Sequence, residues 1–230
     1  MMQRIVTILA GAAAAVGVMV AAPTLTGHPF SLPGHTADTD LAPLHASRFN
    51  SDGHPTQWAT CRISMVVNPD GAPAGALSLI REAAREVSAA TGMTIRITDT
   101  DSTLTPAASY GVKNSGPVIV SFGVPGQVNV ADHTYALYTG RVGAVNGTVV
   151  YWAGMLTINT ATWAPLGAGS DGRGQQLGTV LHEMLHMVGF GHSTSPASLM
   201  YPQANGISGI TDDVTANLSE VVPSQCRRPH

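Results

Sequence analysis

Charged side chains are scarce in this sequence: Asp, Glu, Lys and Arg together make up 11% of its 230 residues. Lys and Arg number 11 against 14 Asp and Glu, which gives a formal net charge of −3 at pH 7. Proteins that bind nucleic acid usually carry a basic surface that neutralises phosphates. The composition provides no such surface, so nucleic acid is excluded as an expected partner.

Cysteine is also rare, with only Cys61 and Cys226, one near each end of the expected domain. In an exported protein such a pair is most simply one disulfide. Closing so long a loop would stabilise the fold by roughly 5 kcal/mol, an upper figure of the chain-entropy model. Two free thiols or two zinc ligands are the alternatives, although a histidine cluster elsewhere in the chain already forms a complete metal site.

Glycine and proline, by contrast, are plentiful, with 25 and 15 residues, and apolar residues make up 44% of the chain. This composition suits a secreted globular domain with long ordered loops. The length is enough for one domain of ordinary size with additional residues at the N-terminus.

The first 22 residues predict a secretory signal peptide, and therefore a secreted or extracellular protein. They carry one charge, Arg4, followed by an apolar stretch from Ile5 to Ala22. An uncleaved membrane anchor is the alternative, since about 18 apolar residues is near the lower limit for a span. Much of the stretch is Ala and Gly, which drive insertion weakly, so cleavage is favoured. A membrane is expected as a partner only through such an uncleaved segment.

Residues 23–57 read as a linker or a short pro-segment, because they show no sustained periodicity and are rich in Pro, Gly, His, Thr and Asp. They hold four scattered histidines, which favours a solvated linker over a metal site: His28, His35, His45 and His54. Ordered structure is expected to begin near Trp58, and residues 58–230 to form the folded domain.

Residues 182–192 read HEMLHMVGFGH and contain the most informative pattern in the chain. His182 and His186 are four residues apart, so on an α-helix they lie one turn apart on one face. Glu183 lies about 100° further round the helix. Gly189 can adopt positive φ without steric cost, which lets the chain turn sharply and bring His192 back toward the other two imidazoles.

Three neutral imidazoles that leave one position open are typical of a catalytic zinc site. The metal lowers the pKa of a bound water from about 15.7 toward about 7, and Glu183 would act as its general base. Two core or surface imidazoles would be a simpler interpretation of His182 and His186 alone. That interpretation leaves Glu183, Gly189 and His192 as coincidences, so we predict a zinc-dependent hydrolase that needs one catalytic Zn²⁺.

The motif HExxHxxGxxH, followed by Ser-Leu-Met-Tyr-Pro at residues 198–202, resembles the metzincin metallopeptidases. Within that clan, Ser193 and the Leu-Met-Tyr-Pro turn are most similar to the matrixins. The resemblance implies an endopeptidase that acts on proteins or peptides. It also implies that Met200 forms an apolar floor beneath the zinc and that Tyr201 and Pro202 begin the wall of the substrate pocket. Asp213 either forms a hydrogen bond beneath this turn or, as an acidic residue in the first turn of a helix, interacts favourably with the helix dipole.

The same resemblance implies an α+β fold of the metzincin or zincin type: a twisted mixed β-sheet, an active-site helix and a small C-terminal helical subdomain. Hydrophobic periodicity predicts strands at 63–67, 95–97, 118–122, 140–145 and 149–159 and helices at 73–90, 173–188 and 211–222. An extended substrate would add to an edge strand, for which Gly140–Val145 is the candidate.

Other polar residues carry weaker signals. Asp99, Asp101 and Asp171 lie in loops where Ca²⁺ could bind, but without a regular ligand spacing they fit solvated turn acids better. Asp132-His133 is similar to part of the second zinc site of animal matrixins, although no further unassigned histidine follows before His182. Residues 23–57 contain no cysteine, so they cannot use the thiolate by which animal matrixins are kept latent.

A protein of a different class remains as the alternative: a non-catalytic cell-surface protein that binds zinc for structure or interaction. Glu183 argues against it, because a structural site has no need of a base and usually fills its fourth position with a protein ligand. The sequence indicates neither the natural substrate nor the oligomeric state.

Overall fold

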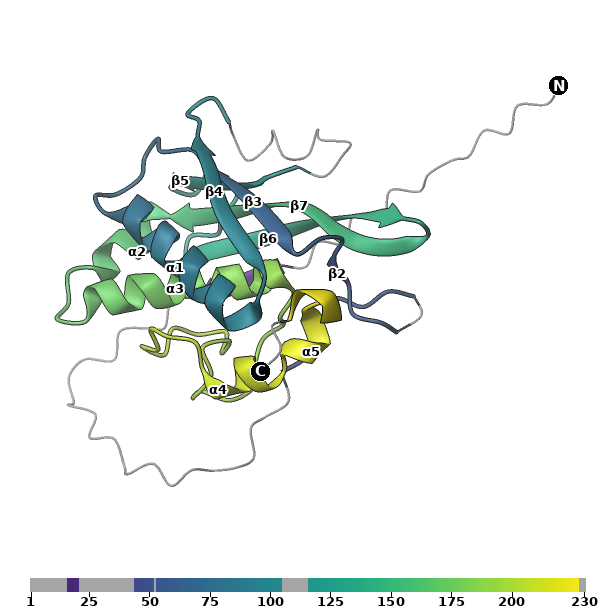
Figure 1. Cartoon of the computed structure of the whole chain (residues 1–230). Helices are drawn as coiled ribbons and strands as arrows, with labels where there is room; N and C mark the ends of the chain where they lie inside the picture. The colour runs from purple at the N-terminus through teal and green to yellow at the C-terminus, as the bar shows by residue number, and fades with distance from the viewer. Residues whose placement is uncertain (1–15, 21–43, 52, 105–115, 228–230) are drawn as a thin grey trace.

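The computed structural model describes residues 16–20, 44–51, 53–104 and 116–227. Figure 1 shows a β-sheet with the long helices on one of its faces and the C-terminal helices beyond them. The elements, in chain order, are β1 (Val16–Val20), β2 (Gln57–Trp58), β3 (Arg62–Val67), α1 (Ala76–Thr91), β4 (Thr94–Thr100), β5 (Val118–Gly123), β6 (Thr134–Val145), β7 (Thr148–Asn159), α2 (Thr160–Leu166), α3 (Gly172–Val188), α4 (Asp212–Ala216), α5 (Leu218–Val221) and the 3₁₀-helix η2 (Ser224–Cys226).

The sheet is mixed, with the strand order β1-β6-β7-β5-β3-β4 and β2 paired with β7. Strands β4, β3, β5 and β7 run parallel, whereas β6 is antiparallel to β7. Every residue of β5 is buried, Ser121 included, as the largely apolar sequence of residues 118–122 predicted. Strand β1 pairs antiparallel with the outer edge of β6.

Helices α1 and α3 pack against each other on one face of the sheet (Figure 1). Helix α1 is amphipathic, and its buried positions recur with the helical period: Ala76, Leu79, Ile80, Ala83, Ala84, Val87 and Thr91. Helix α3 is different, because every residue from Leu177 to Val188 is buried. Such a helix is enclosed on all sides by the rest of the domain. Its side chains are therefore held in fixed positions.

Most of the predicted elements are present, and the mixed architecture of a sheet with few helices is confirmed. Strand β6 begins at Thr134, earlier than the predicted Gly140, and α2 was not predicted. The single helix predicted over residues 211–222 is wrong, because α4 and α5 are separate. Asn217 stands between them, and its side-chain amide donates to the carbonyl of Asp213, a local bond that competes with helix continuation.

Ordered structure begins upstream of Trp58. Leu44 is fully buried, Ala46 is 7% exposed, and Ala46 forms an antiparallel bridge with Phe190. Leu44, Ala46 and Thr56, expected in a linker or pro-segment, are therefore packed against the domain. The sequence gives little sign of this, because the contacts are mostly made by the backbone.

The predicted signal peptide, residues 1–22, lies largely outside the described residues; only β1 falls within it. Among the helices that the structure describes, none is both long enough and apolar enough to cross a membrane.

The two cysteines form the predicted disulfide, Cys61–Cys226, across 165 residues of sequence. The bond joins the start of β3 to η2 and so ties the C-terminal helices to the sheet. A link across so long a loop removes much conformational entropy from the unfolded chain.

Gly178 marks the closest packing of α3 against the loop that follows the predicted methionine turn. A Cβ atom at this position would lie 2.1 Å from the backbone carbonyl oxygen of Ile207. Because the obstructing atom belongs to the backbone, it cannot move aside as a side chain can. Gly178 is one turn before His182, so this contact bears directly on the position of the first imidazole.

We predict that Gly178→Ala destabilises the protein by about 2 kcal/mol or more, because overpacking outweighs the gain in helix propensity of roughly 1 kcal/mol. The measurement is the free energy of unfolding in urea. The matched control is Gly209→Ala, since a Cβ there meets no atom within 4 Å and should change stability little. Equal stability of the two variants would contradict the close packing.

Candidate metal centre

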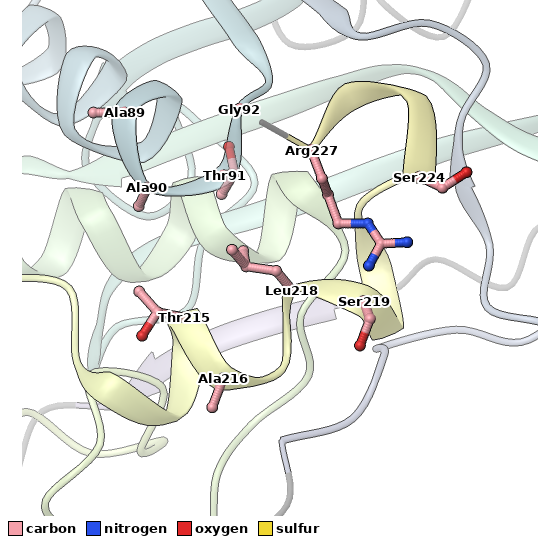
Figure 2. A pocket seen from close by; sticks show the side chains of 10 residues that line it. All are labelled: Ala89, Ala90, Thr91, Gly92, Thr215, Ala216, Leu218, Ser219, Ser224 and Arg227. Carbon is pink, nitrogen blue, oxygen red and sulfur yellow. The ribbon is translucent and has the colours of Figure 1, made fainter. Parts of the chain in front are cut away.

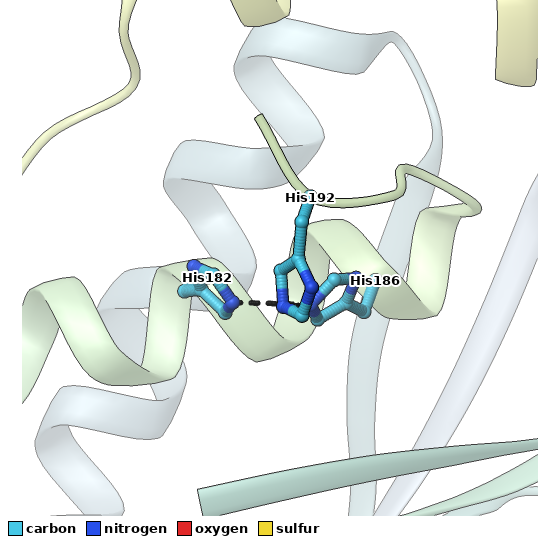
Figure 3. Close-up of side chains that lie close together, drawn as sticks. All are labelled: His182, His186 and His192. Carbon is cyan, nitrogen blue, oxygen red and sulfur yellow. Dashed lines mark hydrogen bonds between the residues drawn. The ribbon is translucent and has the colours of Figure 1, made fainter. Parts of the chain in front are cut away.

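Three imidazoles converge at the C-terminal half of α3, as the sequence motif predicted. His182 and His186 extend from the helix, and His192 reaches back from the segment that follows it (Figure 3). The Nε2 atom of His186 lies 3.0 Å from Nε2 of His182 and 3.1 Å from Nε2 of His192. In the described part of the chain, no other group of three or more His, Cys, Asp or Glu could hold a metal ion together.

The turn that returns His192 depends on Gly189, which caps α3 with a φ of 130°. L-residues with side chains rarely adopt this conformation, so the glycine is required for the sharp exit from the helix. This part of the sequence-based prediction is confirmed.

Backbone carbonyls hold the two helical imidazoles in one orientation. Nδ1 of His182 lies 2.7 Å from the carbonyl oxygen of Leu199, and Nδ1 of His186 lies 2.7 Å from that of Phe190. A carbonyl oxygen can only accept a hydrogen bond, so Nδ1 of each ring carries the proton. In a neutral imidazole the other nitrogen, Nε2, is then an acceptor with a free lone pair.

All three imidazoles are disposed to remain neutral. Burial lowers the pKa of His182 to about 4 and also lowers the pKa values of His186 and His192. The contact between Nε2 of His182 and Nε2 of His186, drawn as a dashed line in Figure 3, therefore brings two lone pairs face to face. Such lone pairs repel each other unless a cation lies between them.

A zinc ion fits this arrangement. In tetrahedral geometry, Zn–N distances of about 2.0–2.1 Å place the ligand nitrogens roughly 3.3 Å apart, close to the observed separations. The bonds to Leu199 and Phe190 are the outer contacts that orient metal-ligating histidines in proteins. His182, His186 and His192 would hold the ion, and the described residues add no fourth ligand to their cluster.

Glu183 is fully buried, and its two carboxylate oxygens differ in their surroundings. Oε2 accepts a hydrogen bond of 2.6 Å from the backbone N–H of Tyr138 in β6. Oε1 is buried and has no hydrogen-bond partner among the described atoms. Burial raises the pKa of Glu183 to about 8, so its proton affinity lies in the range that a general base needs at neutral pH.

The predicted methionine turn is tied both to the ligands and to the C-terminal helices. Met200 is fully buried, its carbonyl accepts from the N–H of Ser193, and its N–H donates to Oγ of Ser198. Ser198 Oγ in turn donates to the buried carboxylate of Asp213. The alternative in which Asp213 hydrogen-bonds beneath this turn is confirmed.

Sequence reasoning missed the partners that are backbone atoms. The carbonyls of Leu199 and Phe190 and the N–H of Tyr138 have no residue-type signature, so no motif could have indicated them. Tyr201 and Pro202, the predicted start of the pocket wall, follow Met200 directly and are partly exposed. Their contact with a substrate stays a prediction.

The weaker metal candidates do not join the cluster. Asp101 uses its carboxylate to accept hydrogen bonds from the N–H and hydroxyl of Thr103, which is the behaviour of a turn acid. Asp99 accepts from the N–H of Thr100. Binding of Ca²⁺ by these residues and Asp171 stays untested, as does a second zinc at Asp132-His133.

A separate cavity of about 680 Å³ lies between the C-terminal end of α1 and the C-terminal helices (Figure 2). Thr91, Leu218 and Arg227 are among the residues that line it, and the lining contains no histidine or carboxylate. The cavity therefore offers neither metal ligands nor a general base, and the histidine cluster remains the candidate active site.

We predict that His186→Ala abolishes stoichiometric zinc binding, because the central imidazole of the three is removed. His133→Ala, an exposed histidine outside the cluster, is the control and should retain one zinc per chain. Zinc content of the dialysed proteins by atomic emission is the measurement. One equivalent of zinc bound to the His186→Ala protein would show that the ligand set is wrong.

The buried carboxyl of Glu183 predicts a pH dependence for the metal-free protein. Because its folded pKa is raised from 4.5 to about 8, the folded state holds a proton that the unfolded chain has lost between these values. The Glu183 contribution to stability therefore falls as pH rises from 4.5 to 8, by up to about 5 kcal/mol.

The measurement is urea unfolding with chelator at several pH values, with Glu183→Gln as the control that cannot ionise. The parent should lose stability relative to this variant as pH rises, and zinc should reduce the loss, since a cation favours the carboxylate. A constant difference between the two proteins across this range would contradict the prediction.

No protein-family model matches the sequence, and no curated protein matches it. Solved structures of similar fold include archaemetzincin from Methanopyrus kandleri, with 12% identity and a TM-score of 0.46 over 70% of this chain and 96% of that one. A zinc-dependent peptidase from Methanocorpusculum labreanum shows 14% identity and a TM-score of 0.39 over 68% of this chain and 99% of that one. Metalloproteinase-II from Bacteroides fragilis shows 13% identity and a TM-score of 0.42 over 80% of this chain but only 59% of that one. These structural neighbours are zinc peptidases. At these identities and TM-scores, the similarity does not assign their activity to this chain.

Proposed function

We propose that this protein is a zinc-dependent endopeptidase. One observation carries the proposal: Glu183, the neighbour of a metal ligand, is a fully buried carboxylate with one oxygen anchored and the other without a partner. A buried, unpartnered carboxylate oxygen is costly to the fold. It is explained if Oε1 serves the reaction by receiving a proton.

Zinc bound to His182, His186 and His192 would supply two kinds of chemistry, lowering the pKa of a water molecule and polarising the carbonyl of the scissile bond. The protein supplies the rest. Leu199 and Phe190 keep the imidazoles in the tautomer that can bind the ion. The lowered pKa values of the histidines keep them available at neutral pH.

Glu183 acts as the general base and then as the general acid. Its carboxylate takes a proton from the attacking water while the water oxygen bonds to the carbonyl carbon of the peptide. When the C–N bond breaks, Glu183 gives this proton to the departing amine nitrogen and is ionised again. No covalent acyl intermediate with the protein is needed.

The peptide substrate would lie along the edge of β6 that β1 occupies in this structure, in the place of β1. Tyr138, whose N–H anchors Glu183, is in the part of β6 that β1 covers, with Gly17 opposite it. That edge can therefore accept an extended strand in antiparallel orientation beside the general base. The sequence-based candidate, Gly140–Val145, belongs to the same strand, but the part of β6 that contacts Glu183 and pairs with β1 is Thr134–Thr139.

We also propose a matrixin-like assignment within the metzincins. Ser193 and the Leu199-Met200-Tyr201-Pro202 turn support it, as do the hydrogen bonds that link Ser193 and Asp213 to this turn. In this proposal Met200 is the floor beneath the zinc, and α4, α5 and η2 are the small C-terminal subdomain.

Export is a further part of the proposal. Residues 1–22 have the composition of a secretory signal, and the Cys61–Cys226 disulfide suits an oxidising compartment. Residues 23–43 would then be the removable part of any pro-segment, because residues from Leu44 onward pack against the domain.

A non-catalytic protein that binds zinc for structure or cell-surface interaction is the alternative. It would share the histidine cluster but would have no use for the free oxygen of Glu183. Both proposals predict the same content of bound zinc, so only the turnover of a peptide substrate distinguishes them.

We predict that Glu183→Gln lowers peptidase turnover by a factor of about 10² to 10⁴, the usual contribution of a general base. Gln has nearly the same volume, and its side-chain oxygen can still accept from the N–H of Tyr138, but it cannot take the water's proton. Cleavage of casein by parent and variant at equal zinc loading is the measurement.

Zinc content and the unfolding profile of the variant serve as controls and should match those of the parent. If folded, zinc-loaded Glu183→Gln cleaves casein at a tenth of the parent rate or faster, the role assigned to Glu183 is wrong. If the zinc-loaded parent cleaves neither casein nor other unfolded proteins, the non-catalytic alternative is favoured.

A further inference from the structure

The turn between the second and third imidazoles is held by residues far upstream in the sequence. The N–H of Ser47 donates to the carbonyl of Gly189 at 2.8 Å, and the N–H of Gly191 donates to the carbonyl of His45 at 2.8 Å. These bonds flank the antiparallel bridge between Ala46 and Phe190. The upstream segment at residues 45–47 thus pairs with both sides of the turn.

The upstream segment is itself anchored to the domain. Leu44 is fully buried, and the hydroxyl of Ser47 lies 3.2 Å from that of Tyr151 in β7. Downstream, the loop closes where the N–H of Thr56 donates to the carbonyl of Arg48. The indole N–H of Trp58 then donates to the carbonyl of Met187 at 2.6 Å, next to His186 in sequence. These contacts fix the exit from α3 from outside the helix.

The turn serves two of the three metal ligands at once. The carbonyl of Phe190 accepts from Nδ1 of His186 and so sets the orientation of that ring. His192 follows Phe190 by two residues, so the path of the turn decides where its ring lies. Phe190 stands between Gly189 and Gly191, and glycines leave the backbone more conformational freedom than any other residue. A turn of this composition needs an external restraint to keep one conformation.

We propose that Leu44–Ser47, the clamp segment, is a positioning element of the metal centre. It restrains the Gly189–Gly191 turn and thereby preorganises His186 and His192 for zinc. This inference rests on the zinc site of the proposed function but not on peptidase activity. It has a consequence for maturation: processing that leaves the metal centre intact removes no residue from Leu44 onward.

Substitutions at Ser47 in the full chain test the clamp segment. Ser47→Pro removes the N–H that bonds to Gly189, whereas Ser47→Ala keeps this N–H and loses only the hydroxyl contact with Tyr151. Competition with a chromogenic chelator measures zinc affinity, and the absorption spectrum of the Co²⁺-loaded protein reports ligand geometry.

We expect Ser47→Pro to weaken zinc binding about 10- to 100-fold, the usual effect of losing an outer contact of a metal ligand, and to alter the Co²⁺ spectrum. Ser47→Ala should stay within about threefold of the parent. A folded Ser47→Pro protein that binds zinc as tightly as the parent would overturn the proposal.

Hydrogen exchange of the parent protein provides a second test that needs no variant. Coupling between two sites is reciprocal, so if the clamp segment favours zinc binding, zinc must stabilise the clamp segment. Removing zinc with a chelator should therefore speed amide exchange at Ser47 and Gly191 while the amides of β5 stay protected. Unchanged exchange at these two positions would contradict the coupling, even if Ser47→Pro fails to fold.

The outcomes are separable from those of the peptidase proposal. A zinc-binding protein without peptidase activity would still pass both tests of the clamp segment. Conversely, loss of turnover in Glu183→Gln at full zinc loading concerns only the peptidase proposal. Each proposal is therefore overturned only by its own measurement.

Discussion

The convergence of three imidazoles, two of which turn their Nε2 lone pairs toward each other, is the constraint on which the rest of the structure depends. His182 and His186 each give the Nδ1 proton to a backbone carbonyl, so their Nε2 atoms face each other without a proton between them. This arrangement is unfavourable without a cation and must be enforced by the fold. The carbonyls that enforce it belong to two turns, one at Leu199 and the other at Phe190.

Each turn is supported by a different part of the chain. The turn at Leu199 and Met200 is held through Ser198 by the carboxylate of Asp213, which belongs to α4. The turn at Phe190 is bridged by Ala46 from the upstream side. Helix α3 carries two imidazoles between these turns and is buried throughout its second half, so the ligands have little freedom to depart from this geometry.

Glu183 connects the metal centre to the sheet. Its Oε2 accepts from Tyr138 in β6, so helix α3 and the strand that would bind the substrate are joined at the carboxylate. The bond fixes one oxygen and leaves the other free. In the proposed mechanism, a carboxylate held in this way needs no reorganisation before it accepts a proton, which is the advantage of a preorganised polar group in a buried site.

The sequence predicted the histidine cluster, the disulfide and most strands and helices, because these depend on side-chain types at fixed spacings. It could not predict the contacts of Leu199, Phe190 and Tyr138, because any residue type offers the same backbone atoms. The first half of β6 was missed because Thr134 and Ala136, at two of its three buried positions, give little hydrophobic signal, although Tyr138 at the third is fully buried. The packing of residues 44–57 was missed because it depends on backbone pairing with a segment more than 100 residues away.

Dependence of peptide cleavage on bound zinc would show that the histidine cluster holds a catalytic metal. The purified full chain would be assayed on casein as prepared, after removal of metal with a chelator, and during titration with zinc, while bound zinc is measured in the same samples. We predict that cleavage disappears with the metal and returns in proportion to bound zinc, reaching its maximum at one ion per chain. Cleavage that persists in the metal-free protein, or a folded protein with one bound zinc and no cleavage, would contradict this prediction.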